Sequence, residues 1–180
     1  MLAHEAADQL ALDEVLLVPV GESPYKAIDP EPGPEVRLEM VRLAAGGDSG
    51  LAASDVETDR DGPSFTFRTL ELLRDARPTD EFAFILGADV AAGLEGWREP
   101  QRVLELARLG IAARPGSALD EAEAALERLG AQDRARFVRM PEIGVSSTSI
   151  RRRIAAGRPI RHLVPDPVIE FIAERSLYGG

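Results

Sequence analysis

Short runs of apolar residues alternate along this chain with stretches in which apolar positions recur every three or four residues. The runs at residues 14–19 and 82–86 are continuous, as is typical of strands buried on both faces, and 82–86 is the clearest. Weaker runs at residues 51–56, 109–113 and 134–140 predict further strands. Together these runs supply the strands of a sheet.

The intervening stretches have helical periodicity, with Ser64 placed to cap one of the helices. Strands that alternate with helices at this spacing form βαβ units. We therefore predict one α/β domain over residues 1–180, with a mostly parallel sheet, helices on both faces and a helical C-terminal segment. The predicted helices cover residues 2–11, 35–45, 65–76, 100–107, 118–129 and 165–175, and one more begins near Ser146 and stops before Gly157.

The stretch Gly144–Arg153 contains the clearest candidate chemistry. Ser146 or Ser147 suits a helix N-cap, where free N–H groups and partial positive charge favour an anion. Thr148 and Ser147 lie three and four positions before Arg151, so both hydroxyls share a helix face with its guanidinium. This pattern predicts a phosphate site. The alternative interpretation is a capped surface helix with solvated arginines.

Ligands of open parallel sheets bind beyond the carboxyl ends of the strands. The loops expected at that edge are residues 19–26, which hold the only lysine (Lys26), Gly87 to Asp89, Arg114 to Gly116, and residues 144–148. The convergence of these loops strengthens the phosphate interpretation.

Composition narrows the function further. The chain lacks cysteine, which excludes disulfides and thiolate metal sites, and its two histidines, His4 and His162, are far apart in sequence. No apolar run approaches the roughly 20 residues of a membrane helix, and no signal peptide pattern is visible, so we expect a cytoplasmic protein. A net charge of −10 disfavours nucleic-acid and membrane binding, although residues 143–165 carry five arginines and no acid.

An ordered set of motifs resembles one family along essentially the whole chain. The chain is similar to the bacterial nicotinate (nicotinamide) mononucleotide adenylyltransferases of the nucleotidyltransferase superfamily. Each motif is weak alone, but their order is specific. The motifs are Pro19-x4-Pro24-x-Lys26, Arg37-Leu38-x-Met40, Gly62-Pro63-Ser64-Phe65-Thr66, Leu86-Gly87-Ala88-Asp89, Trp97, Arg114-Pro115-Gly116 and Val145-Ser146-Ser147-Thr148-x-Ile150-Arg151.

The resemblance implies a Rossmann-like fold and transfer of AMP from ATP to nicotinate mononucleotide, with Mg²⁺, giving deamido-NAD and pyrophosphate. The implied partners are these two small molecules, with no nucleic acid or membrane; a homo-oligomer is left open. By resemblance, the ATP phosphates are held by Ser146, Ser147, Thr148 and Arg151, the nucleotide by Gly87 and Asp89, the adenosine end by Arg114, the nicotinate by Phe65, Thr66 and Trp97, and a phosphate by Lys26.

Each assignment has a plain structural alternative. Trp97 and Phe65 are also typical core residues, and Asp89 after a strand is also a typical helix cap beside a glycine turn at Gly87. Arg114 and Lys26 are also compatible with an ordinary loop and a solvated side chain.

The family's His-x-Gly-His motif, which follows its first strand, is absent from this sequence, and His4 is expected inside a helix. The fold is therefore expected to lack its first strand, and this exact chain to be inactive or nearly so, with no intact catalytic residue. One explanation is a start codon assigned about 20 residues too late, enough for a strand and a loop. The other is a truncated, inactive relative.

Two further functions stay open. A sister adenylyltransferase would act on nicotinamide mononucleotide or phosphopantetheine, although Phe65, Thr66 and Trp97 favour the nicotinate acid. A non-catalytic nucleotide- or nucleic-acid-binding protein would use Arg151 to Arg153 on a recognition helix, which the net charge disfavours.

Overall fold

Five parallel strands form two sheets in the computed structural model, which describes residues 1–23, 32–113, 118–141 and 144–179. In the first sheet β1 pairs with β2, and in the second β4 lies between β3 and β5. Within the described residues, β1 and β3 each have a strand neighbour on one side only. The strands are β1 (Val15–Leu17), β2 (Leu51–Ala53), β3 (Phe82–Gly87), β4 (Ala107–Ala113) and β5 (Ala135–Arg139).

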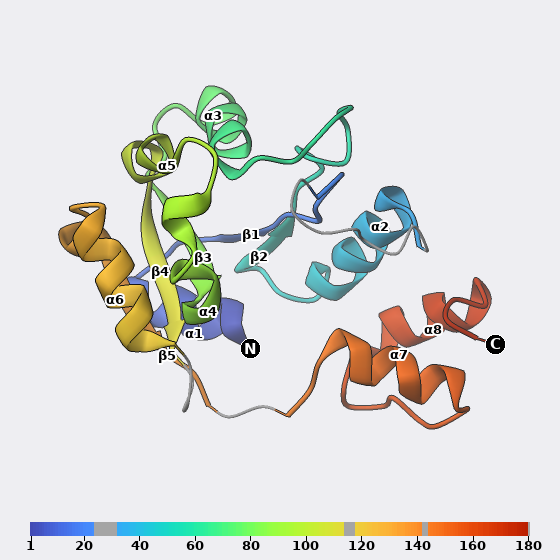
Figure 1. The fold of residues 1–180 in the computed structure, drawn as a ribbon. Helices are drawn as coiled ribbons and strands as arrows, with labels where there is room; N and C mark the ends of the chain where they lie inside the picture. Colours follow the sequence, from blue (N-terminus) through green and yellow to red (C-terminus); the bar gives the residue numbers. More distant parts are fainter. Residues whose placement is uncertain (24–31, 114–117, 142–143, 180) are drawn as a thin grey trace.

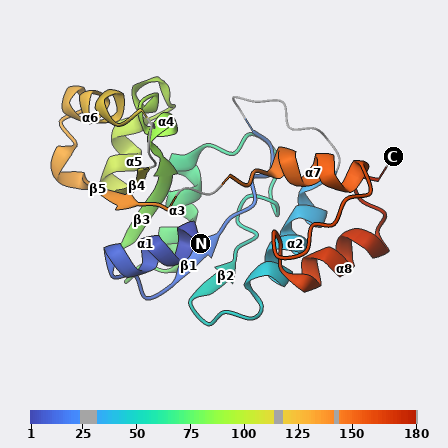
Figure 2. The same ribbon diagram turned by 90° about the horizontal axis from the view of Figure 1, so that it is seen from below.

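Helices cover both faces of the larger sheet: α1 lies on one face, and α4, α5 and α6 lie on the other (Figures 1 and 2). This arrangement confirms the predicted α/β class with a parallel sheet. No described helix is long and apolar enough to cross a membrane. The helices are α1 (Leu2–Leu10), α2 (Pro34–Ala45), α3 (Thr66–Ala76), α4 (Ala88–Ala91), α5 (Pro100–Leu106), α6 (Leu119–Arg128), α7 (Ser147–Ala155) and α8 (Asp166–Glu174), with short 3-10 turns at Leu94–Gly96 and Gln132–Arg134.

The burial of two predicted strands differs from expectation. In β3 only Leu86 is buried, and the other residues of the strand are partly exposed; in β1 only Val15 is buried. The prediction that both strands are buried on both faces was therefore wrong. The physical reason is their position: each has an edge without a strand partner among the described residues, so its apolar side chains lack neighbours there.

The main core lies between the larger sheet and the helices α3 to α6. Leu109 and Ile111 of β4 point into it, and both are almost fully buried. Gly110 between them faces α1, since a Cβ there would lie 2.7 Å from Leu10 Cδ1. Successive residues of β4 therefore face opposite sides of the sheet, alternately toward the main core and toward α1.

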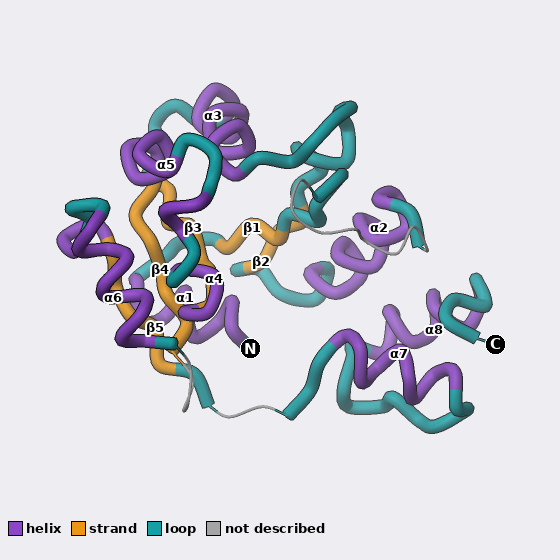
Figure 3. The backbone as a smooth tube through the Cα atoms, in the orientation of Figure 1, coloured by secondary structure: helices purple, strands orange, loops and turns teal. Residues whose placement is uncertain are grey.

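A second apolar cluster joins the C-terminal helices to α2. Ile160, Val168 and Ile172 are buried, and Ile150 and Ile154 of α7 pack against them together with side chains of α2. Figures 1 and 3 show α7 and α8 as a pair set apart from the larger sheet. The chain therefore has two apolar centres, and α2 belongs to the second.

The outer edge of β5 is partly closed by one side chain of α1. The Gln9 amide donates to the Arg139 carbonyl at 3.0 Å, and its oxygen accepts from the Arg139 N–H at 2.8 Å. A primary amide thus takes the place of a neighbouring strand at this position. Such a contact protects an edge against pairing with another chain.

Replacing Ile111 by alanine should lower the free energy of unfolding by about 2–5 kcal/mol, because it removes a fully buried side chain and leaves a cavity. Urea unfolding measures the change. Arg108→Ala on the same strand is the control: Arg108 is exposed and pairs with Glu81 at 3.0 Å, so its loss should cost less than about 1 kcal/mol. Equal losses for both variants would contradict this core.

Candidate active site

Two serines cap the start of α7 reciprocally. The Ser146 hydroxyl accepts a hydrogen bond from the Ser149 N–H at 3.1 Å. In return the Ser149 hydroxyl accepts from the Ser146 N–H at 3.0 Å and donates to the Ser146 carbonyl at 2.7 Å. The predicted N-cap is therefore confirmed at Ser146, whose oxygen is committed to the helix.

The first turn of α7 keeps donors for a ligand. Ser147 and Thr148 are the first two helical residues, where main-chain N–H groups have no partner inside a helix. Both residues are exposed, and Arg151 follows Thr148 by three positions on the same face. Hydroxyls, free N–H groups and a guanidinium at the positive end of a helix suit an anionic group such as a phosphate.

The other end of α7 is closed by its own contacts. Gly157 has a φ of +63° and donates its N–H to the Ile154 carbonyl at 2.9 Å, while the Arg158 N–H reaches the Arg153 carbonyl at 2.8 Å. The Arg153 side chain donates twice to the Pro159 carbonyl, at 2.9 and 2.7 Å. Arg153 therefore supports the turn after α7, which agrees with the predicted stop before Gly157.

Gly87 and Asp89 lie at the carboxyl end of β3. A Cβ on Gly87 would lie 2.5 Å from Asp89 Oδ1, so the missing side chain leaves room for the carboxylate. No side-chain hydrogen bond caps α4, and the interpretation of Asp89 as a helix cap was therefore wrong. Asp89 is exposed at the edge of the sheet where ligands of parallel α/β folds bind.

An aromatic group gathers where α3 and the segment before α5 meet. Trp97 packs edge-on against Phe84 of β3, with ring centroids 5.9 Å apart, and Phe65 stacks on Phe67 at 6.1 Å. The guanidinium of Arg98 lies 4.9 Å from the centroid of the Phe65 ring. Phe65 and Trp97 are only partly buried, so both retain surface for a ligand while Trp97 also packs against the main core.

Next to this group, the segment after β1 crosses the segment after β2. The Gly21 N–H donates to Ser64 Oγ at 3.2 Å, and the Ser64 N–H donates to the Glu22 carbonyl at 2.7 Å. A Cβ on Gly21 would lie 2.3 Å from the Glu57 carbonyl oxygen, so the approach requires glycine. The prediction that Ser64 caps α3 was therefore wrong, because the Ser64 hydroxyl accepts a hydrogen bond from Gly21 instead. The residue directly before α3 is Phe65, and no side chain caps this helix.

Buried and half-buried polar side chains brace the crossing. Thr69 of α3 donates to Glu57 at 2.7 Å, and both residues are buried. Arg37 of α2 donates to the carbonyl oxygens of Val20 and Gly21. Arg37 belongs to one of the sequence motifs, but the motif alone assigned it no role. These contacts show that it is structural and holds α2 against the segment after β1.

Ion pairs hold α3 beside α5 at the surface, where Figure 1 shows the two helices side by side. Arg102 Nε donates to Glu71 at 3.0 Å, and Nη1 donates to Glu105 at 2.9 Å. The hydrogen bond from Arg102 holds the pKa of Glu71 below its ordinary value, and those to Glu105 and Glu71 raise the pKa of Arg102. Exposed pairs stabilise little, so we assign them an orienting role.

The predicted site residues fall into three groups. Phe65, Thr66 and Trp97 gather at the start of α3 and in the segment before α5, whereas Gly87 ends β3 and Asp89 lies in α4. The residues of α7 lie elsewhere: Figures 1 and 2 place α7 beside α8 and α2, apart from α4. Lys26 and Arg114 lie outside the described residues. Sequence reasoning missed Arg98 and Gly21, although a cation directly after the only tryptophan was visible.

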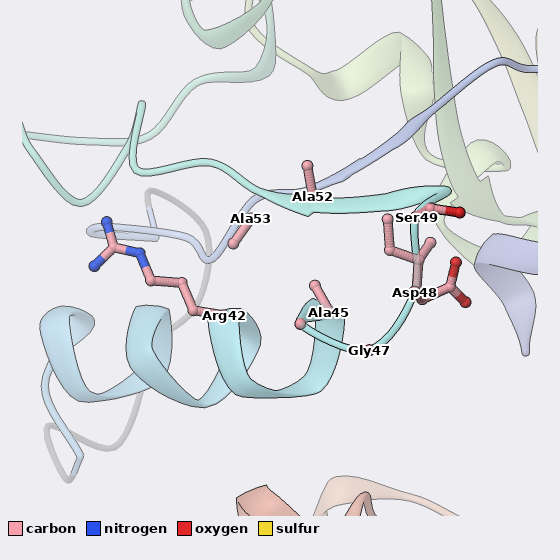
Figure 4. Close-up of a pocket in the computed structure, with 9 residues that line it drawn as sticks. Arg42, Ala45, Gly47, Asp48, Ser49, Ala52 and Ala53 are labelled. Carbon is pink, nitrogen blue, oxygen red and sulfur yellow. The ribbon is translucent and has the colours of Figure 1, made fainter.

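An open hollow of about 560 Å³ lies between the end of α2 and β2, as Figure 4 shows. Its lining includes Arg42, Asp48 and Ser49 but none of the predicted site residues. Asp48 accepts a hydrogen bond from His4 at 2.5 Å, which holds the pKa of Asp48 below its ordinary value. This hollow therefore lies apart from the predicted site residues, between the end of α2, the turn after it and β2.

The Mg²⁺ that the resemblance implies requires oxygen ligands. Among the described residues, no group of three His, Cys, Asp or Glu side chains could hold a metal ion. Mg²⁺ in phosphoryl-transfer sites is bound by one or two carboxylates and the substrate phosphates.

The fold and these loops define a class: a parallel α/β nucleotide-binding protein with a helix start suited to phosphate. The family model "cytidylyltransferase-like" matches residues 1–153. Proteins named as probable nicotinate-nucleotide adenylyltransferases are 41% identical in Roseiflexus sp. (strain RS-1) and 40% identical in Thermus thermophilus. These matches cover 98% and 99% of this chain and 88% and 90% of the relatives. The chain therefore belongs to the nicotinate-nucleotide adenylyltransferases within the cytidylyltransferase-like family.

Solved structures support the fold. Plasmodium falciparum nicotinic acid mononucleotide adenylyltransferase complexed with NaAD superposes with a TM-score of 0.70, and the same enzyme complexed with APC with 0.69. Both are 18% identical and cover 98% of this chain and 90% of that chain. At this identity the likeness concerns the fold alone, and it confirms the predicted Rossmann-like architecture.

Replacing Ser146 by alanine should lower the free energy of unfolding by about 1 kcal/mol, because the Ser149 N–H loses its acceptor. Ser147→Ala is the matched control, since Ser147 gives no cap and its loss should change stability by less than about 0.5 kcal/mol. Thermal unfolding of both variants measures the difference. The reverse order of effects would contradict the capping geometry.

Proposed function

We propose that this protein transfers the AMP moiety of ATP to nicotinate mononucleotide, forming deamido-NAD and releasing pyrophosphate. The observation that carries the proposal is family membership over nearly the whole chain, combined with a phosphate-type helix start at α7. The family uses ATP as a substrate; the second substrate and the roles of individual residues are part of the proposal.

In the proposed reaction an oxygen of the nicotinate mononucleotide phosphate attacks the α-phosphorus of ATP. A new phosphoanhydride bond forms, the bond to the β-phosphate breaks, and pyrophosphate leaves. No covalent enzyme intermediate is involved. The protein contributes by holding the two nucleotides in line and by neutralising phosphate charge, which are the main sources of catalysis in phosphoryl transfer.

The ATP phosphates are assigned to the first turn of α7. Ser147 and Thr148 offer hydroxyls and main-chain N–H groups, and Arg151 offers a guanidinium on the same face. Ser146 acts mainly by capping the helix, which keeps this turn in position. Lys26 and Arg114 are assigned to a phosphate and to the adenosine end by resemblance alone.

The nucleoside and pyridine ends are assigned to the other two groups. Asp89 accepts hydrogen bonds from ribose hydroxyls, and Gly87 lets the nucleotide approach the main chain. Phe65 and Trp97 contact the pyridine ring, while the uncapped start of α3 at Thr66 offers N–H donors to its carboxylate. When bound with the ATP phosphates, Mg²⁺ would supply charge neutralisation on them.

The reaction is tested with the product of the complete gene, by measuring pyrophosphate release from ATP and nicotinate mononucleotide. Release should require both substrates, and mass spectrometry should identify deamido-NAD. Nicotinamide mononucleotide and phosphopantetheine serve as comparison substrates. Absence of turnover with the nicotinate nucleotide, or faster turnover with either comparison substrate, would contradict the proposal.

Replacing Arg151 by glutamine should weaken ATP binding about tenfold, because a charge-assisted hydrogen bond to phosphate is lost. Equilibrium titration with ATP measures the change. Arg152→Gln is the control: Arg152 is exposed and neighbours Arg151 on α7 but points from a different part of the helix. Equal weakening by both variants would mean that general charge, rather than the proposed site, binds ATP.

A further inference from the structure

The aromatic group contains a cation for which neither the sequence pattern nor the family comparison provides a role. Arg98 follows Trp97 directly, and its guanidinium lies 4.9 Å from the centroid of the Phe65 ring. Trp97 is fixed by its edge-on contact with Phe84, and Phe65 by the start of α3. The positive charge of Arg98 therefore lies over Phe65, one of the two aromatic residues assigned to the pyridine ring, and Arg98 directly follows the other in sequence.

A second positive field lies beside it. α3 is a helix of 11 residues whose start carries no side-chain cap and no acidic residue in its first turn. The N-terminal end of such a helix carries partial positive charge. The positive charge of Arg98 and the partial positive charge at the start of α3 therefore act together next to Phe65. A negatively charged substituent on a ring bound here would be favoured.

We propose that Arg98 is a specificity-determining residue, which selects a pyridine carboxylate nucleotide over the corresponding carboxamide. The inference rests on the proposed function, since it uses the assignment of Phe65 and Trp97 to the pyridine ring. The two nucleotides share the ribose, the phosphate and the ring. They differ only in the substituent, which is anionic in one and neutral in the other, so any preference between them reports on charge at this place.

The size of the effect follows from exposure. Arg98 is exposed to solvent, and exposed ion pairs are weak because water and salt screen them. We therefore expect Arg98 to contribute about a fivefold preference for the carboxylate. The start of α3 would supply the rest, so removing Arg98 lowers the preference without abolishing it.

A purely structural role for Arg98 gives a different result. If its guanidinium only covers the Phe65 ring, its removal changes the shape of the pocket for both nucleotides. Their affinities would then fall together, and the ratio between them would stay constant. The ratio of affinities therefore separates selection from packing.

Trp97 is the only tryptophan, so its fluorescence reports binding without the need for turnover. Nicotinate and nicotinamide mononucleotides are titrated into the complete protein and into Arg98→Gln and Arg98→Lys variants. The glutamine variant should lose about fivefold of the preference for the carboxylate, and the lysine variant, which keeps the charge, should retain most of it. Added salt should reduce the preference of the unaltered protein more than that of the glutamine variant, which keeps only the contribution of the α3 start.

Arg102→Gln is the matched control, since Arg102 lies four residues further on and is paired with Glu71 and Glu105. Its preference should equal that of the unaltered protein. An unchanged ratio in Arg98→Gln, or an equal loss in Arg102→Gln, would overturn the inference while leaving the proposed function intact. Failure of the unaltered protein to bind either nucleotide would contradict the proposed function and the inference with it.

Discussion

Apolar surface in this protein is buried in two separate clusters, and each candidate site residue is positioned by the cluster that its element joins. The main cluster fixes β3, α4 and the segment before α5, which carry Gly87, Asp89 and Trp97. The second cluster fixes α7 through Ile150 and Ile154. Because apolar burial is the dominant favourable term in folding, the distance between α7 and the larger sheet is set by how these clusters are linked.

Helix α2 provides that link. Its apolar side chains Met40 and Leu43 pack in the second cluster with α7 and α8. Its Arg37 donates to the main-chain carbonyls of Val20 and Gly21, at the crossing that leads to the aromatic group. One helix thus contacts both the helices that carry the proposed ATP site and the segment next to the proposed pyridine site. A shift of α2 would move the two sites relative to each other.

Local signals in the sequence were sufficient for most elements. The periodicity of α6 and α8, the serines before α7 and the glycine after it predicted these helices within one or two residues. Errors arose where a side chain had a distant partner. Ser64 had the composition of a helix cap but is bound to Gly21, and β3 had the composition of a buried strand but forms the edge of its sheet. Neither the contact of Ser64 with Gly21 nor the edge position of β3 can be read from the neighbouring residues in the sequence.

By itself, the sequence determined the α/β class, the order of the elements and the helix start at the serines before α7. These depend on residue spacing and on caps, which act over three or four neighbouring positions. Only the tertiary structure decided that Arg98 lies over Phe65, and that the Ser64 hydroxyl accepts from Gly21 instead of capping α3. The reason is physical: such contacts form when packing brings distant segments together, and their partners follow from the fold rather than from the local pattern.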